Sequence, residues 1–476
     1  MTHDTRRRFL STSSKALLLA ACGSVGVRTA NAKTHSHTQN LAGNPTKASA
    51  GSFAHNHAHT QNLGNHALDS NAHKIGQNAP TQNTGSQNLA SQTPSELDPA
   101  QNLNSHNPPQ NLNAQNAHSP NTHNPNAQGA QSPHSTALPL RTLGRANPLQ
   151  VSALAFGCMG LNYHRSKNLS EREAARITSH AVDMGINFFD TAQVYGPNSN
   201  EILVGKILKP YRHRLIIATK FGFGRDERTL DSSPKRIREV AEQSLKRLGL
   251  ECLPLFYQHR FDPQTPIESV AHTIQELIKE GKVARWGVCE LGAKSIERAH
   301  AICPLSAIQS EYHLMWRNVE REILPTLERL SIGFVAYSPL ARGYLSGKPM
   351  RNSDFDPKND NRASFPRYQD SALRANYGVI RLLREFATLL AKKHATPPIT
   401  EAQLALSYLL AKSPHIVPLF GTTNAEHLRE DVESASLFYR YHIWQAEDLR
   451  AFEKRLDSIA IVGARYPSEQ EMRVER

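Results

Sequence analysis

The stretch Gly185-Ile-Asn-Phe-Phe-Asp190-Thr-Ala-Gln-Val-Tyr195-Gly196 contains a short apolar run that ends in a carboxylate, with a phenol five residues later. Two further apolar runs end in a polar side chain, namely Leu215-Ile-Ile-Ala-Thr-Lys220 and Leu253-Pro-Leu-Phe-Tyr-Gln-His259. Short, nearly continuous apolar runs are typical of buried parallel strands, and in a β/α barrel the carboxyl ends of such strands face the active site. We therefore predict that four side chains converge there: Asp190, Tyr195, Lys220 and His259.

The order of apolar runs and helical patterns indicates eight successive β/α units. The expected strand ends lie near Gly157, Asp190, Lys220, His259, Cys289, Gln309, Tyr337 and Pro418. The expected helices cover residues 171–183, 199–208, 234–248, 267–280, 293–301, 319–330, 378–394, 399–412, 425–437 and 445–459. A domain over residues 138–476 has the size of one elaborated barrel. The predicted fold class is therefore α/β, a (β/α)8 TIM barrel, and the polar stretch between residues 343 and 377 is its expected active-site loop.

The four converging side chains suit the reduction of a carbonyl group. Hydride addition leaves an oxyanion that must be protonated, and a tyrosine with an ordinary pKa near 10 donates more readily when a lysine stabilises its phenolate. Asp190 would hold Lys220, and His259 would orient the carbonyl oxygen. General acid catalysis of this kind contributes roughly 10²–10⁴-fold, while the hydride comes from a nicotinamide. The alternative is an ordinary ion pair at two strand ends beside a loop aromatic.

Several longer motifs follow one another in a fixed order along residues 138–467. They are Phe156-Gly-Cys-Met-Gly160, Asp190-Thr-Ala-Gln-Val-Tyr195-Gly196, Ile217-Ala-Thr-Lys220, Gln258-His259-Arg260 with Asp262-Pro263, Gln309-Ser-Glu-Tyr312, Ala336-Tyr-Ser-Pro-Leu340 and Pro418-Leu-Phe-Gly-Thr422. This set resembles the aldo-keto reductases of the bacterial, plant and yeast type, which have a long loop after the seventh strand. The resemblance implies reversible, NAD(P)H-dependent reduction of a small aldehyde or ketone, with Tyr195 as the general acid.

The same resemblance implies which residues hold the cofactor. The nicotinamide would stack on Tyr337, and residues after the eighth strand would meet the adenosine phosphate. The full expected set is Met159, Cys289, Glu290, Gln309, Tyr337, Ser338, Leu340, Arg342, Gly421, Thr422 and His427. The cofactor expected is NADP(H), with NAD(H) as the alternative, and no metal site is expected.

This chain departs from the family pattern at the cofactor side. Cys289 stands where serine is usual, and a thiol is the weaker hydrogen-bond partner. Asn424 follows Thr423 where relatives often carry a lysine or arginine, and Asp431 replaces a common asparagine. Because the missing cation weakens recognition of a 2′-phosphate, a reduced preference for NADPH is expected. No Gly-x-Gly-x-x-Gly motif follows the first strand, which argues against a Rossmann domain.

The first 32 residues have the pattern of an export signal. Thr5-Arg-Arg-Arg-Phe-Leu-Ser11 contains twin arginines, and the apolar stretch Ala16-Leu-Leu-Leu-Ala-Ala21 is too short to span a membrane. We predict a Tat signal over residues 1–32, with the Tat machinery as a partner and the periplasm as the destination. Two processing sites remain open: Ala30-Asn-Ala32 suits signal peptidase, and Leu19-Ala-Ala-Cys22 resembles a lipobox that would make a lipid-anchored lipoprotein at Cys22. A disordered basic tail is the alternative.

Residues 33–137 have the composition of a disordered linker. They contain one aromatic residue, Phe53, and are otherwise rich in Asn, Gln, His, Ser and Pro, so they cannot bury enough apolar surface to form a core. Eleven of the 23 histidines lie in this linker, and clustered imidazoles bind transition metals weakly. A His-rich exported metal-binding protein is therefore one alternative function, and a non-catalytic nicotinamide-binding regulatory subunit is another. The net charge of +13 comes from interspersed residues, which does not suit nucleic-acid binding.

The export signal makes a direct prediction. Replacing the twin arginines, Arg6→Lys with Arg7→Lys, should leave unprocessed protein in the cytoplasm of the native host, because the Tat pathway recognises that pair. Mass spectrometry of the mature N-terminus then distinguishes a lipidated Cys22 from an unmodified Lys33. A mature chain that still begins at residue 1 would contradict both processing routes.

Overall fold

The computed structural model describes residues 138–165, 167–226 and 228–475. The predicted export signal (residues 1–32) and the predicted linker (residues 33–137) lie outside these described residues, and both stay predictions. Among the described residues, no helix has the length and apolar character that crossing a membrane requires. No cluster of three or more metal-ligating side chains occurs in this part of the chain either.

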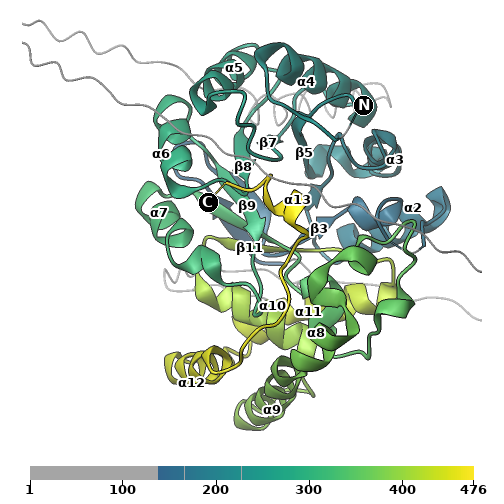
Figure 1. The fold of residues 1–476 in the computed structure, drawn as a ribbon, viewed down its shortest axis with the longest axis vertical. Helices are drawn as coiled ribbons and strands as arrows, with labels where there is room; N and C mark the ends of the chain where they lie inside the picture. The colour runs from purple at the N-terminus through teal and green to yellow at the C-terminus, as the bar shows by residue number, and fades with distance from the viewer. Residues whose placement is uncertain (1–137, 166, 227, 476) are drawn as a thin grey trace, which may run out of the picture. The chain divides into compact units, whose positions relative to one another are not determined.

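Eight parallel strands close into a barrel (Figure 1). They are β3 (Ala155–Gly157), β4 (Phe188–Asp190), β5 (Ile216–Phe223), β7 (Leu255–Gln258), β8 (Trp286–Cys289), β9 (Ala307–Glu311), β10 (Gly333–Tyr337) and β11 (Ile416–Phe420). Each strand pairs with the next one along the chain, and β3 pairs with both β4 and β11, which closes the ring. The predicted (β/α)8 TIM barrel is confirmed.

Helices surround the barrel and connect its strands. They are α2 (Glu171–Asp183), α3 (Ser199–Ile207), α4 (Pro234–Leu248), α5 (Ile267–Lys279), α6 (Ala293–Ile302), α7 (Ile323–Leu330), α8 (Asp370–Ala375), α9 (Tyr377–Lys393), α10 (Glu401–Lys412), α11 (Ala425–Tyr439), α12 (Ala446–Asp457) and α13 (Ser468–Glu471). Local sequence explains several of their starts. Ser233 accepts a hydrogen bond from the Arg236 N–H and is followed by a proline in the first turn, while Ser170 and Thr400 form capping boxes.

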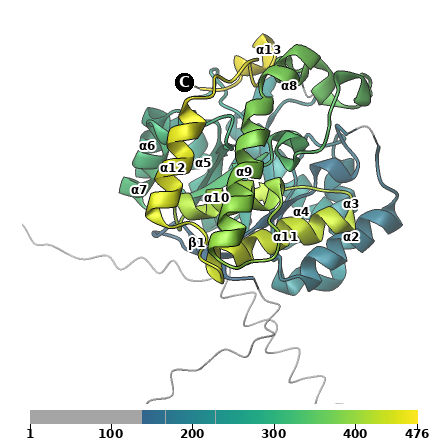
Figure 2. The same ribbon diagram turned by 90° about the horizontal axis from the view of Figure 1, so that it is seen from below.

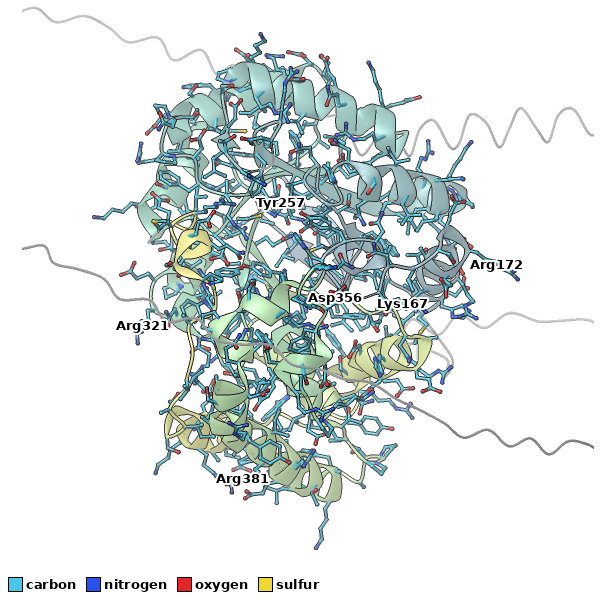
Figure 3. All side chains as sticks on the ribbon, turned by 45° about the vertical axis from the view of Figure 1, so that its right-hand side comes forward. Lys167, Arg172, Tyr257, Arg321, Asp356 and Arg381 are labelled. Carbon is cyan, nitrogen blue, oxygen red and sulfur yellow. The ribbon has the colours of Figure 1, made fainter. Side chains whose placement is uncertain are left out.

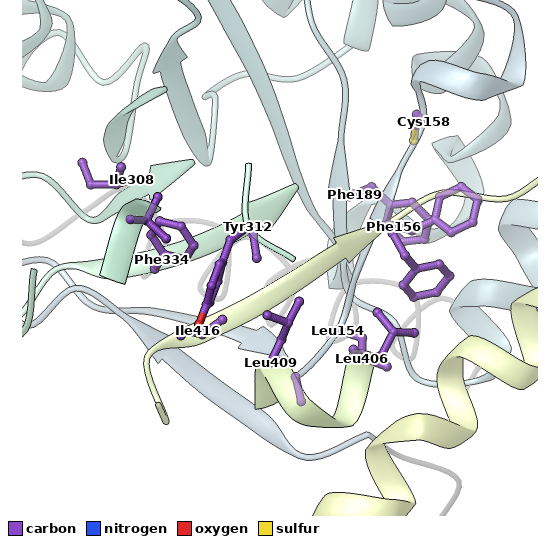
Figure 4. Close-up of a cluster of buried hydrophobic side chains, with 14 of the residues drawn as sticks. Leu154, Phe156, Cys158, Phe189, Ile308, Tyr312, Phe334, Leu406, Leu409 and Ile416 are labelled. Atoms are coloured by element: carbon purple, nitrogen blue, oxygen red, sulfur yellow. The ribbon is translucent and has the colours of Figure 1, made fainter. Parts of the chain in front are cut away.

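Two apolar layers hold the barrel and the helices together. Figure 4 shows part of the outer layer, in which Phe156 and Phe189 of the strands pack near Leu406 and Leu409 of α10. The inner layer fills the barrel itself with small, medium-sized and aromatic side chains from the strands, namely Ala155, Phe188, Ala218, Leu255, Tyr257, Cys289, Ala307, Val335, Val417 and Leu419. Charged side chains such as Arg172 and Arg381 project outwards from their helices, whereas Tyr257 lies inside (Figure 3). The barrel is therefore a packed core, as the apolar runs require.

A hairpin precedes the barrel and closes one end of it. Strands β1 (Leu140–Leu143) and β2 (Leu149–Ser152) pair in antiparallel fashion, and Leu143, Leu149 and Val151 join the inner apolar layer. Figure 2 shows β1 at the opposite end from α8 and α13. No strand was expected here, because these short segments lack a distinctive apolar run. The carboxyl ends of the barrel strands therefore face the other end of the barrel.

The elements differ from the sequence expectation at two places near the site. The helix expected over residues 319–330 is a 3₁₀ turn, Asn318–Glu320, followed by α7, because Pro325 cannot donate a backbone hydrogen bond and is tolerated only in a first helical turn. Strand β5 continues past Lys220 to Phe223, since Gly222 and Phe223 pair with the short antiparallel strand β6 (Leu230–Asp231). Lys220 therefore lies within its strand.

Gly287 in β8 offers a test of the packed barrel. A Cβ atom added there would come within 2.5 Å of the Tyr257 ring and would also meet the Ala307 carbonyl oxygen. Gly287→Ala should therefore lower the free energy of unfolding by about 1–3 kcal/mol through overpacking. Gly378→Ala is the matched control, because its Cβ meets only Ile459 at 3.6 Å on helix α9. Denaturant melts that show no loss of stability for Gly287→Ala would contradict the packing described.

Candidate active site

The four side chains predicted from the strand ends lie together at the carboxyl end of the barrel. Asp190 is the last residue of β4, Lys220 lies in the neighbouring β5, and His259 directly follows β7, which pairs with β5. Tyr195 lies in the loop after β4, with its ring centroid 5.7 Å from that of His259. The structure thus brings all four together from three adjacent strands.

Lys220 is fully buried and is held on several sides. Its Nζ forms an ion pair with Asp190 Oδ1 and donates a 2.8 Å hydrogen bond to the Thr191 carbonyl oxygen. It also lies 3.5 Å from the Tyr195 hydroxyl oxygen. Burial alone would lower the pKa of Lys220, but the charge of Asp190, together with Tyr195 and Cys289, raises that pKa above its ordinary value. Lys220 therefore stays an ammonium next to the Tyr195 phenol.

Tyr195 and His259 are both held in their neutral forms. Burial raises the pKa of Tyr195, and the positive charge of Lys220 works against that rise. Burial, followed by the charges of Arg260 and Lys220, lowers the pKa of His259 well below its usual value. The site at neutral pH therefore presents a phenol with a proton to give and an uncharged imidazole that can donate a hydrogen bond.

The backbone around this mouth is strained. Four residues other than glycine have positive φ after β8 and β10: Glu290 (55°), Ser338 (52°), Ala341 (46°) and Arg342 (50°). Such conformations cost free energy for residues with a Cβ atom and are concentrated at functional sites. Glu290, Ser338 and Arg342 belong to the expected cofactor set. Their positive φ angles could not be predicted from the sequence.

The ring expected to stack on a nicotinamide is fixed by its hydroxyl group. Tyr337 donates to Glu290 Oε1 over 2.8 Å and also contacts the Tyr466 hydroxyl. Cys289 and Gln309 lie on the adjacent strands β8 and β9, and Gln309 Nε2 donates to Asp190 Oδ2 over 2.9 Å. The ring, the thiol and the amide thus occupy neighbouring strand ends, next to the buried ion pair. Burial raises the pKa of the Cys289 thiol to about 12, so it stays protonated.

The C-terminal segment closes over this part of the mouth and was missed by sequence reasoning. Arg465 binds Glu290 with both terminal nitrogens, at 3.1 and 2.8 Å, and its side chain is 3% exposed. Glu475 accepts hydrogen bonds from the Gly292 N–H and the Ser295 hydroxyl at the start of α6. The segment around α13 therefore lies across the ends of β8 and β10. The sequence showed only that this segment is rich in charged residues.

Arg342 is bound to a neighbouring carboxylate. Its terminal nitrogens donate to the two oxygens of Glu311, at 2.9 and 3.1 Å. Burial alone would raise the pKa of Glu311, but Arg342 and His313 hold it well below its usual range. Because Glu311 already occupies this guanidinium, the role of Arg342 as a cofactor contact stays a prediction.

The long loop after β10 spans the mouth towards the segment after β3. It folds as a series of 3₁₀ turns followed by the short helix α8. Asn359 Nδ2 donates to the Arg165 carbonyl oxygen, and Arg165 donates to Asn361 Oδ1 over 3.2 Å. Met159 begins the 3₁₀ turn after β3, on the same side as this contact. Ser338 and Leu340 lie between β10 and the loop. The loop expected at the active site is therefore at the mouth.

The start of α11 holds the residues expected to meet the adenosine phosphate. Gly421 and Thr422 follow β11, and Asn424 Oδ1 caps α11 by accepting from the N–H groups of Glu426 and His427. Lys348 of the long loop donates to His427 Nε2. A cation from a different part of the chain thus stands beside the position where Asn424 replaces a basic residue, and sequence reasoning missed it.

Asp431, the other departure on this helix, is buried. Burial, followed by the charge of Glu430, raises the pKa of Asp431 well above its usual value. A carboxyl group kept neutral in this way has one O–H donor and acceptor oxygens. It therefore offers the same kinds of hydrogen bond as the asparagine that it replaces.

This combination of side chains fits a nicotinamide dinucleotide. The residues present provide an aromatic face at Tyr337, polar partners on β8 and β9, and cationic and imidazole groups at the start of α11. Residues 153–452 match the family model described as "Aldo/keto reductase family". The chain belongs to the aldo/keto reductase family.

Similar proteins agree with this membership, which places the chain among oxidoreductases. A Glycine max protein described as a probable aldo-keto reductase is 38% identical over 321 residues, which cover 67% of this chain and 89% of the relative. The glycerol dehydrogenase structure from Gluconobacter oxydans is 28% identical with a TM-score of 0.57, covering 68% of this chain and 97% of that one. A holo-form aldo-keto reductase from Bacillus halodurans is 26% identical with a TM-score of 0.54, covering 70% and 99% respectively.

Proposed function

We propose that this protein is an NADP(H)-dependent reductase that converts aldehydes or ketones into alcohols, reversibly, with Tyr195 as the general acid. One observation carries the proposal: a buried, permanently charged Lys220 lies 3.5 Å from the Tyr195 hydroxyl oxygen. Placing a charged lysine in the interior costs free energy that a solvent-exposed ion pair avoids. The placement is useful where a phenolate forms transiently.

Each of the four side chains then has one task in the reaction. The nicotinamide, when bound, supplies or accepts the hydride. Tyr195 donates its proton to the oxygen that becomes negative, and Lys220 stabilises the phenolate that remains. Asp190 keeps Lys220 charged and in place, and the neutral His259 donates a hydrogen bond to the carbonyl oxygen.

The cofactor side supports NADP(H) over NAD(H). A 2′-phosphate needs a cation, and Lys348 provides one beside His427 at the start of α11. Burial, followed by the charge of Lys348, lowers the pKa of His427, so the imidazole is a neutral hydrogen-bonding partner. The N–H groups of Glu426 and His427 are already capped by Asn424, so the side chains must carry the recognition. Lys348 thus compensates for Asn424.

Two other functions have less support. A non-catalytic nicotinamide-binding subunit would have no use for the arrangement of Lys220 and Tyr195. A His-rich metal-binding protein would depend on residues 33–137, outside the described residues. We keep as proposals the Tat signal at residues 1–32, the lipid anchor at Cys22 and a periplasmic location.

Replacing the general acid tests the function directly. Tyr195→Phe should lower kcat for reduction of an activated aromatic aldehyde by NADPH by at least 10²-fold, because the proton donor is lost. NADPH binding, followed by quenching of tryptophan fluorescence, should survive. Tyr211→Phe, a change to a tyrosine outside the mouth, is the control. Unchanged kcat in Tyr195→Phe under conditions where hydride transfer limits the rate would rule out this role.

Replacing the cation tests the cofactor preference. Lys348→Met should weaken NADPH binding roughly 10-fold, the lower end for a charge-assisted contact, because Lys348 is solvent-exposed. NADH binding should hardly change, and Asn424→Lys should restore NADPH binding in the double variant. Lys358→Met, another exposed lysine of the same loop, is the control. Equal dissociation constants for NADPH in the wild type and Lys348→Met would show that the phosphate is held elsewhere.

A further inference from the structure

Arg260 stands next to the catalytic imidazole without a carboxylate partner. It follows His259 at the end of β7 and is half-buried, and its Nη1 donates to the His259 carbonyl oxygen over 2.8 Å. Within residues 138–165, 167–226 and 228–475, no other hydrogen bond or ion pair engages its guanidinium. A guanidinium has five N–H donors, so most of its hydrogen-bonding capacity remains free.

Two other arginines of the mouth are paired on both of their terminal nitrogens. Arg342 binds Glu311, and Arg465 binds Glu290. Glu290 Oε1 accepts hydrogen bonds from Arg465, the Tyr337 hydroxyl and the Glu311 N–H. Glu290 is already used in this way; it contributes a favourable charge to Arg260, but no ion pair between the two occurs among the described residues.

The charge of Arg260 acts on both sides of the mouth. On the catalytic side it lowers the pKa of His259 and opposes the rise in the pKa of Tyr195. On the cofactor side, the phenols of Tyr337 and Tyr466 raise the pKa of Arg260 itself, against the effect of its burial. The charge of Arg260 is therefore felt both by the proton donor and by the ring expected to stack on the nicotinamide.

Aromatic rings surround the His259 imidazole, the side chain that precedes Arg260. The His259 ring contacts Phe223 at 5.2 Å and Tyr195 at 5.7 Å, measured between centroids, and Tyr163 lies 5.9 Å from Tyr195. Aromatic walls beside a half-buried arginine suit a flat organic molecule that carries an anionic group. Arginine matches the planar, two-oxygen geometry of such groups better than any other side chain.

We propose that Arg260 binds an anionic group of the carbonyl substrate, a carboxylate or a phosphate monoester, and thereby selects oxo acids or phosphorylated aldehydes over neutral carbonyl compounds. The proposal rests on the reductase function proposed above. Since Arg260 adjoins His259, the anion would be anchored on the same side of the mouth as the polarised carbonyl oxygen. A charge-assisted contact of this kind changes affinity roughly 10–150-fold.

A matched pair of aldehydes tests the preference. The carboxylate of 4-carboxybenzaldehyde and the nitro group of 4-nitrobenzaldehyde have nearly the same shape but different charge. The wild type should favour the carboxylate through a lower KM, and Arg260→Gln should reduce the ratio of the two kcat/KM values at least 10-fold. Arg260→Lys should keep part of the preference. Arg381→Gln, which removes an exposed arginine of α9 (Figure 3), should not change the ratio.

A phosphate arm and a binding arm complete the test. Comparing glyceraldehyde 3-phosphate with glyceraldehyde shows which anion Arg260 prefers. Benzoate binding to the cofactor-free protein, measured by calorimetry, should weaken with rising salt and be lost in Arg260→Gln, whose fold is checked by its melting temperature. The proposal would be overturned if the wild type and Arg260→Gln had the same ratio of kcat/KM values for the two benzaldehydes and bound benzoate equally well. If neither aldehyde is reduced, the reductase function fails, and benzoate binding still decides whether Arg260 holds an anion.

Discussion

The buried ion pair between Lys220 and Asp190 is the interaction on which the rest of the site depends. Two charges removed from water must be compensated by geometry and by further hydrogen bonds, and the loss of one partner typically costs 3–5 kcal/mol. Here Gln309 donates to Asp190, and the Thr191 carbonyl oxygen accepts from Lys220. The barrel has to hold β4, β5 and β9 in register for these contacts to exist together. The ammonium group of Lys220, held in this way, lies next to the Tyr195 phenol.

Much of this arrangement could be predicted from the sequence, because it depends on patterns of residues that are close together in the chain. The apolar runs that end at Asp190 and His259 are buried strands, and a closed parallel barrel brings their carboxyl ends to one mouth. The helices expected over residues 171–183 and 234–248 match α2 and α4, which Ser170 and Ser233 cap. Short-range physical chemistry therefore sufficed for the barrel and for the four convergent side chains.

Other parts of the site depend on contacts between distant segments, which have no local signature. Lys348 reaches His427 from a loop far away in the chain, and Arg465 neutralises Glu290 from the C-terminal segment. The positive φ of Glu290 is imposed by its tertiary surroundings and cannot be inferred from residue type. The absence of a basic residue at Asn424 is visible in the sequence, whereas the contact of Lys348 with this helix start is visible only in three dimensions.

The central claim is that the charge of Lys220, held by Asp190, makes the Tyr195 proton transferable. The pH dependence of kcat for alcohol oxidation, with hydride transfer limiting the rate, measures this directly, because the Tyr195 phenolate is then the base. The wild type should be compared with the neutral pair Asp190→Asn with Lys220→Met, which leaves no unpaired buried charge. The double variant should raise the pKa of Tyr195 and move the increase in kcat to higher pH, because the lost effect of the Lys220 charge exceeds the opposite effect of Asp190. An unchanged profile in the double variant would contradict the claim.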